Sequence, residues 1–232
     1  MNVPWISKDE ISRKATGLLA TFQAAAGYRV QPPIPVEDII ERTLGLRLMY
    51  ADLSKIMGSN DVLGATYVES KTVCINERLF EDGGEGRLVF TCAHEAGHWG
   101  LHRRLITGQG DGAPSRNGAA MVCRSRNAKE PMEWQADYFA ACLLMPEKEI
   151  RAAFEKVCGP NPLVIKGSIE PGKSDTSPET AYLEQWPIIS AAMCETAGFT
   201  NVSKQAMIIR LEDLGLLINE TSLGLNWQTL LS

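Results

Sequence analysis

Only three histidines occur in this 232-residue chain, and all of them, His94, His98 and His102, lie within nine positions at four-residue spacing. Four residues make about one turn of an α-helix, so a helix here would align the three imidazoles along one face. The letters HEAGH at 94–98 match H-E-x-x-H, in which two imidazoles bind Zn²⁺ and the intervening glutamate lies beside the activated water. We therefore predict His94 and His98 as metal ligands and Glu95 as the catalytic general base.

A catalytic zinc site with two histidines needs a third protein ligand and one position left for water. A second helix, predicted over about residues 131 to 145, presents Glu133 and Asp137 four residues apart on one face. In the gluzincin pattern of zinc peptidases, the first of these positions is a ligand and the second accepts the free N–H of the first histidine. We therefore expect Glu133 to be the third ligand and Asp137 to orient His94.

Four other side chains are alternative ligands or candidates for a role beside the metal. Glu130 is a rival ligand one turn before Glu133, and Cys123 is a soft donor that would give a His₂Cys site. His102 lies about 12 Å from His94 by helical rise, too far to share one metal easily. It either packs or hydrogen-bonds beside the site, or it contacts substrate. Tyr67 ends a predicted strand and is either ordinary strand packing or a second electrophile for the oxyanion.

The elements that must position these residues can be predicted from hydrophobic periodicity. The histidines fall on a helix expected from about residue 87 to residue 103, and strands are expected at 46–50, 63–68 and 72–76. A capping box at Ser7 and Glu10 predicts an N-terminal helix that ends near Gly27. These elements predict an α+β fold with a small antiparallel sheet, which together with the H-E-x-x-H helix resembles a zincin-like metallopeptidase core.

Two segments rich in glycine, serine and proline interrupt the predicted elements. Residues 103–132 carry four more basic than acidic side chains and are too long for a neutral connector, so we expect them to border the site. They are either a solvated loop or a docking patch for an acidic substrate segment. The second segment gives four predicted parts of the chain: an N-terminal helix at 1–30, the core at 31–157, a linker or insertion at 158–185, and a helical region at 186–232.

Composition excludes some classes of partner. The net charge of −5 and the pI near 5.3 provide no general attraction to nucleic acid or to an anionic membrane. The chain has neither a start of signal-peptide type nor an apolar run of membrane-spanning length, so we expect it in the cytoplasm. Its six cysteines form no CxxC pair, and we interpret them as reduced thiols.

The stretch "RLVFTCAHEAGHWGLHR", followed by "MEWQADYFAACLLMP" and preceded by "TVCINERL", resembles the ImmA/IrrE family of bacterial and phage metallopeptidases. The resemblance covers roughly residues 36–150. Residue by residue, it places the zinc ligands of the family on His94, His98 and Glu133 and the catalytic glutamate on Glu95. It implies site-specific cleavage of a helix-turn-helix transcriptional repressor that is usually encoded beside the peptidase.

The C-terminal stretch "AGFTNVSKQAMIIRLEDLGLL" resembles the segment that follows the zincin core in this family and has helix-turn-helix spacing. Residues 186–220 carry two more acidic than basic side chains, the opposite of what phosphate contacts require. We therefore expect this region to pack or to recognise a protein partner, with no direct binding to nucleic acid.

The sequence thus predicts a zinc endopeptidase with one Zn²⁺ per chain and a protein substrate. Two other classes stay open: a zinc-containing module that sequesters a repressor or antitoxin without cutting it, and an amidohydrolase acting on a non-peptide substrate. Manganese or iron can also occupy His₂Glu sites.

Overall fold

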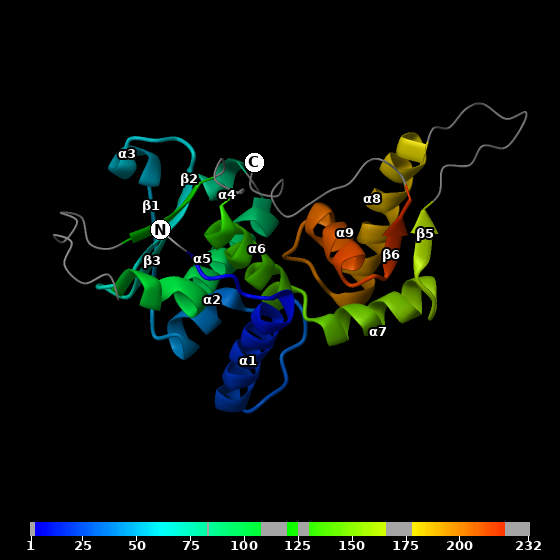
Figure 1. Cartoon of the computed structure of the whole chain (residues 1–232), viewed down its shortest axis with the longest axis horizontal. Helices are drawn as coiled ribbons and strands as arrows, with labels where there is room; N and C mark the ends of the chain where they lie inside the picture. Colours follow the sequence, from blue (N-terminus) through cyan, green and yellow to red (C-terminus); the bar gives the residue numbers. More distant parts are fainter. Residues whose placement is uncertain (1–2, 83, 108–119, 125–129, 166–177, 221–232) are drawn as a thin grey trace, which may run out of the picture.

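The computed structural model describes residues 3–82, 84–107, 120–124, 130–165 and 178–220, arranged as an α+β fold (Figure 1). The helices in these ranges are α1 (Lys8–Ala26), α2 (Val36–Asp38) with the π-helical turn η1 (Ile39–Thr43), α3 (Leu53–Met57), α4 (Leu79–Asp82), α5 (Gly84–Thr107), α6 (Pro131–Leu144), α7 (Glu147–Cys158), α8 (Pro178–Ala197) and α9 (Lys204–Asp213). The strands are β1 (Arg47–Ala51), β2 (Val62–Tyr67), β3 (Thr72–Asn76), β4 (Ala120–Arg124), β5 (Leu163–Ile165) and β6 (Leu217–Asn219).

The main sheet has four strands in the order β1-β3-β2-β4. The three strands expected from the sequence are present, but the expectation of a purely antiparallel sheet is wrong. β2 runs antiparallel to both β3 and β4, whereas β1 runs parallel to β3. The reason is that α3 separates β1 from β2, and the longer connection allows β1 to pair with β3 instead of forming a hairpin with β2.

Strand β4 lies within residues 103–132, which we expected to be a loop bordering the site. Residues 120–124 pair with β2 and extend the sheet on the side opposite β1. Most of the predicted basic loop, residues 108–119 and 125–129, lies outside the described part of the chain. Within residues 108–129, only β4 can be placed relative to the site.

The helix pair α5 and α6 packs closely and carries the residues predicted to do chemistry. Gly97 permits this approach, because a Cβ there would lie 3.1 Å from the carbonyl oxygen of Ala136 on α6. Helix α1 packs against α6, as Figure 1 shows. Ser7 caps α1 by accepting from the backbone N–H of Glu10, and Gly27 ends it in a left-handed conformation, as the sequence predicts.

Helices α7, α8 and α9 form the other end of the molecule with the parallel pair β5 and β6 (Figure 1). The predicted linker at 158–185 therefore contains a strand, and α8 begins at Pro178, earlier than the expected 186. One hydrophobic cluster extends from Ile11 in α1 to Leu217 in β6, so both ends of the molecule share a core. Among the described residues, no helix is both long and apolar enough to cross a lipid bilayer.

Candidate metal centre and catalytic site

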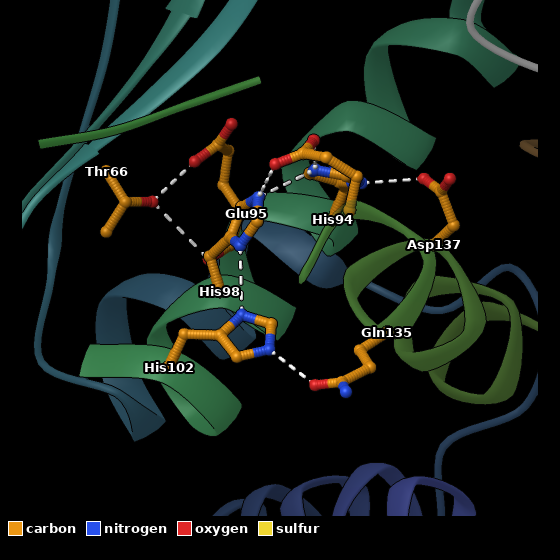
Figure 2. Close-up of polar contacts among 8 residues, drawn as sticks. Thr66, His94, Glu95, His98, His102, Gln135 and Asp137 are labelled. Carbon is orange, nitrogen blue, oxygen red and sulfur yellow. Dashed lines mark hydrogen bonds and ion pairs between the residues drawn. The ribbon is translucent and has the colours of Figure 1, made fainter. Parts of the chain in front are cut away.

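Helix α5 aligns the three histidines on one buried face, as their spacing predicts (Figure 2). His94 Nε2 lies 2.9 Å from His98 Nε2, so the two imidazoles direct the same ring nitrogen to a common point. The letters between and around them are mostly small or apolar, which lets the helix bury this face against α6 and the sheet.

Glu133 on α6 reaches the same point. Its two carboxylate oxygens lie 3.2 Å from His94 Nε2 and 3.3 Å from His98 Nε2. The ligand atoms of a tetrahedral zinc site are about 3.3–3.8 Å apart, as the metal–ligand bond lengths require. The two nitrogen–oxygen separations lie at the lower end of this range, and the 2.9 Å between the two nitrogens lies below it. The three donors therefore converge on one point and would move apart slightly around a small divalent cation. Burial raises the pKa of Glu133, but the hydrogen bonds from both histidines outweigh it and keep the pKa well below its usual range.

Asp137, one turn after Glu133 on α6, contacts the ring nitrogen of His94 that faces away from Glu133. Its carboxylate lies 2.7 Å from His94 Nδ1, and both side chains are buried. Burial alone would lower the pKa of His94, but the charges of Cys123 and Asp137 raise it well above 6.5. Because a carboxylate can only accept, Nδ1–H donates to Asp137, and this contact turns Nε2 toward Glu133. This is the contact expected for a carboxylate that orients a metal-binding histidine.

Glu95 points from α5 toward strand β2 and is completely buried (Figure 2). Thr66 donates a 2.5 Å hydrogen bond to Glu95 Oε2, whereas Oε1 is buried and has no hydrogen-bond partner in the described part of the chain. Gly64 makes room for this carboxylate, since a Cβ at that position would be 2.6 Å from Oε1. Burial raises the pKa of Glu95 despite the opposing effect of His98 and His94. A carboxylate with a raised pKa suits a general base.

His102 continues the stripe as the next link of a hydrogen-bond chain (Figure 2). Its Nδ1 lies 3.1 Å from His98 Nδ1, and its Nε2 lies 2.9 Å from Gln135 Oε1. The amide of Gln135 donates in turn to the carbonyl of Pro4. His102 is completely buried, which favours the packing and hydrogen-bonding interpretation of this residue over substrate contact.

Of the two rival ligands, the structure places one beside the site and the other away from it. The donor atoms of His94, Cys123 and Glu133 all lie within 4.8 Å of one another, and all three residues are buried. Burial raises the pKa of the Cys123 thiol to about 12, although His94 opposes the rise. Glu130, by contrast, is exposed at the N-cap of α6.

Tyr67 does not reach the site. It follows Thr66 in β2, and side chains alternate between the two faces of a strand. Thr66 faces Glu95, so Tyr67 points to the other face, where it packs against the cluster around Leu53 and Cys74. This orientation does not support the oxyanion role considered for Tyr67, which forms no part of the function proposed below.

Sequence reasoning missed Thr66, Gly64 and Gln135, which support Glu95 and His102. A glycine inside a strand signals a close approach of another group, and Gly64 carried that signal in "LGATYV". The roles of Thr66 and Gln135 depend on how β2 and α6 pack against α5, which no local pattern reveals.

Comparison with known families supports the same chemistry. The sequence model described as the IrrE N-terminal-like domain matches residues 41–157, from η1 to the end of α7. No curated protein matches the chain closely enough to add a relative. The match covers half of the chain and includes both α5 and α6. The chain therefore belongs to the Peptidase_M78 family, that of the IrrE N-terminal-like domain, and has a function of the metallopeptidase type.

Proposed function

We propose that the chain is a zinc-dependent endopeptidase that hydrolyses a peptide bond in a protein substrate. The observation that carries the proposal is the meeting of two nitrogens and one carboxylate at a buried point, beside a second carboxylate. The three donors are those of His94, His98 and Glu133, and the second carboxylate belongs to Glu95. A purely structural site has no use for a general base between its histidines.

In this proposal His94, His98 and Glu133 hold one Zn²⁺ per chain, and Asp137 keeps Nε2 of His94 directed at it. When bound, zinc lowers the pKa of water toward 7 and polarises the scissile carbonyl. The fit is supported by the spacing of the donor atoms and by the mixture of imidazole and carboxylate, which zinc accepts.

In this proposal Glu95 is the general base. Thr66 holds Oε2, so the unpartnered Oε1 is the oxygen available to take a proton from the attacking water. The raised pKa of the carboxyl makes the captured proton stable enough to be delivered later to the leaving amine. The fixed position of Glu95 between α5 and β2 removes the need to order the base during the reaction.

We propose a helix-turn-helix repressor as the substrate, which rests on the resemblance to the ImmA/IrrE family. The C-terminal region supports a protein partner more than a nucleic acid. Residues 206–211 of α9 are buried without interruption, so this helix has no free face that could enter a DNA groove. Arg210, one of its two cations, is buried against the carbonyl of Met145.

A second candidate is a zinc-containing module that binds a protein without cutting it. The position of Cys123 favours it, because four protein ligands would close the site as in structural zinc centres. Replacing Glu95 by glutamine distinguishes the two candidates, since only the peptidase depends on that residue.

The first test is the zinc content of purified protein, measured by elemental analysis of wild type, Glu133→Gln and Glu130→Gln. We expect about one zinc per chain in wild type and in Glu130→Gln, the exposed control, and loss of zinc in Glu133→Gln. Full zinc in Glu133→Gln would remove that residue from the ligand set.

The second test incubates wild type and Glu95→Gln with a library of proteome-derived peptides and identifies new N-termini by mass spectrometry. The peptidase produces them in wild type and not in Glu95→Gln, although the variant keeps its zinc. Equal cleavage by both proteins would overturn the mechanism. A helix-turn-helix repressor encoded beside the chain is then assayed for the same dependence on Glu95.

A further inference from the structure

Strand β4 brings one side chain of its own to the metal centre. In the antiparallel pair β2 and β4, Gly64 lies opposite Cys123 and Thr66 lies opposite Met121. Residues directly opposite each other in such a pair point to the same face of the sheet. Thr66 bonds Glu95, and a Cβ on Gly64 would touch Glu95, so this face is the one turned toward α5. Cys123 therefore points at the site.

The neighbours of Cys123 confirm this orientation. Val122 faces the opposite side and packs with the cluster around Leu53 and Cys74. Cys123 itself is completely buried in the main core. Its sulfur is within 4.8 Å of the donor atoms of His94 and Glu133, and these two residues also belong to the His₂Glu set.

Glu95 provides a second and independent observation. Its Oε1 is buried, has no hydrogen-bond partner among the described residues, and lies against Gly64, the residue that pairs with Cys123 across the strands. The base and the thiol thus occupy the same side of the metal centre. A group that enters beside the metal from this side meets both.

We propose that Cys123 is a fourth protein ligand of the metal and that the peptidase is latent while this bond exists. The inference rests on the proposed function and specifies how that site is regulated. A sulfur–metal bond replaces the S–H bond, and the thiol proton is released to solvent as the metal binds. Four protein ligands fill a tetrahedral centre, whereas catalysis needs one position for water. Activity therefore requires the sulfur of Cys123 to leave, with a local shift of β4.

The ligand is tested without relying on activity. X-ray absorption of the zinc-loaded wild-type protein is expected to show one sulfur at about 2.3 Å together with nitrogen and oxygen ligands. The cobalt-substituted protein is expected to show thiolate-to-cobalt charge-transfer absorption. Cys123→Ser should abolish this absorption while still binding one cobalt. Cys74→Ser, on the other face of the same sheet, should keep it.

A zinc shell of nitrogen and oxygen alone, or unchanged charge transfer in Cys123→Ser, would overturn the proposal. If Cys123→Ser does not fold, the absorption measurement on wild type still decides the ligand. Peptide cleavage then tests latency. We expect at least a tenfold rise in the cleavage rate in Cys123→Ser over wild type and over Cys74→Ser.

An unchanged rate in an active Cys123→Ser protein would show that the cysteine does not limit the reaction. No cleavage by any variant, with sulfur present at the metal, would contradict the peptidase function and leave a closed structural site. The spectroscopic and kinetic results therefore separate the failure of this inference from the failure of the proposed function.

Discussion

At the scale of single residues, the two oxygens of Glu95 have different surroundings. Oε2 accepts from Thr66 at 2.5 Å, whereas Oε1 is buried without a partner. Leaving a buried acceptor unpaired costs roughly 1–3 kcal/mol, so the arrangement persists only because packing holds it. Burial raises the pKa of Glu95, and His98, His94 and the hydrogen bond from Thr66 act in the opposite direction. Thr66 thus limits how far the pKa of the base rises.

Thr66→Val is expected to slow catalysis and to change its pH dependence. Valine keeps the shape of the side chain but removes the donor, so the pKa of Glu95 rises further. The acid limb of the kcat/KM profile should therefore move to higher pH, with roughly a tenfold loss at neutral pH from the lost hydrogen bond. Thr72→Val should leave the profile unchanged, because the hydroxyl of Thr72 donates to the carbonyl of Ser70, away from Glu95. Identical pH profiles for both variants would contradict this role.

The hydrogen bonds that link His98, His102 and Gln135 determine which ring nitrogens carry protons. With Nε2 of His98 directed at Glu133, its Nδ1–H donates to His102 Nδ1, and His102 Nε2–H donates to Gln135. This order requires His102 to be neutral. Burial, followed by the effect of His98, lowers the pKa of His102 to about 4.

We expect His102 to make the metal-free protein less stable as the pH falls. In the unfolded chain histidine binds a proton near pH 6.5, whereas folded His102 does so only near pH 4. Between these values the unfolded state holds more protons, so the stability present above pH 6.5 is lost on acidification. The loss should be about 2 kcal/mol at pH 5. Urea unfolding at pH 7.5 and pH 5 should show that His102→Asn loses less free energy of unfolding on acidification than wild type. An equal loss in the two proteins would refute this role of His102.

The proposed ligands and the carboxylate that orients His94 could be proposed from the sequence because each lies on a helix at a four-residue spacing. His94, His98, Glu133 and Asp137 need only two helices to be placed correctly. The supports of the site come from other elements. Thr66 meets Glu95 across 29 positions and Gln135 meets His102 across 33, so tertiary packing alone creates those contacts.

At the scale of elements, the separation of α5 and α6 determines the geometry of the donors. α5 contributes both histidines and α6 contributes Glu133, so any change in their distance moves the carboxylate from the nitrogens. Two glycines of α5 face α6. A Cβ at Gly97 would be 3.1 Å from the Ala136 backbone, while one at Gly100 would be 3.7 Å from the ring of Phe139.

Gly97→Ala should therefore weaken metal binding, and Gly100→Ala should not. The new methyl at 97 meets helix backbone that cannot move alone, and such overpacking costs roughly 1–3 kcal/mol. At 100 the methyl makes an ordinary contact and gains helix propensity of roughly 0.5–1 kcal/mol. Zinc affinity by chelator competition and thermal melting measure both effects. Equal zinc affinity in the two variants would mean that the helix separation is not what positions Glu133.

The sheet shows which features of the fold the sequence pattern could predict and which it could not. The strands β1, β2 and β3 were correctly predicted from their β-forming residues, although the burial pattern alternates only at the start of β1, and β2 and β3 are buried almost throughout. The parallel pairing of β1 was not predictable, since strand order depends on the path of the connection through α3. Strand β4 was hidden in a segment rich in glycine and polar residues, and its pairing with β2 is a long-range contact.

At the scale of the whole molecule, the peptidase part and the C-terminal part share buried contacts. The family match ends at residue 157, as does the core expected from the sequence. Because β5 pairs with β6, we propose that the C-terminal unit begins with β5, earlier than the 186 first expected. The two parts nevertheless meet through a buried ionic group. Asp213 of α9 accepts from Arg210 at 3.0 Å and from Tyr138 of α6 at 2.9 Å.

Asp213→Asn is expected to destabilise the whole chain in a single transition. The substitution leaves Arg210 buried without its carboxylate and weakens the contacts to Tyr138 and to Lys8 of α1. Removing one partner of a buried ion pair costs roughly 3–5 kcal/mol, so the free energy of unfolding should fall by about that amount. Glu69→Gln, an exposed acid on the sheet hairpin, should change it by less than about 0.5 kcal/mol.

Circular dichroism and tryptophan fluorescence in urea measure this change, and the two signals should fall together in both proteins because one core spans the molecule. Two separate transitions, of which Asp213→Asn moves only one, would show instead that the C-terminal unit unfolds by itself. In that case partner binding by α8 and α9 could occur without disturbing the metal centre. A single transition means that a partner which displaces α9 also loosens α6, because Tyr138 and Glu133 belong to the same helix.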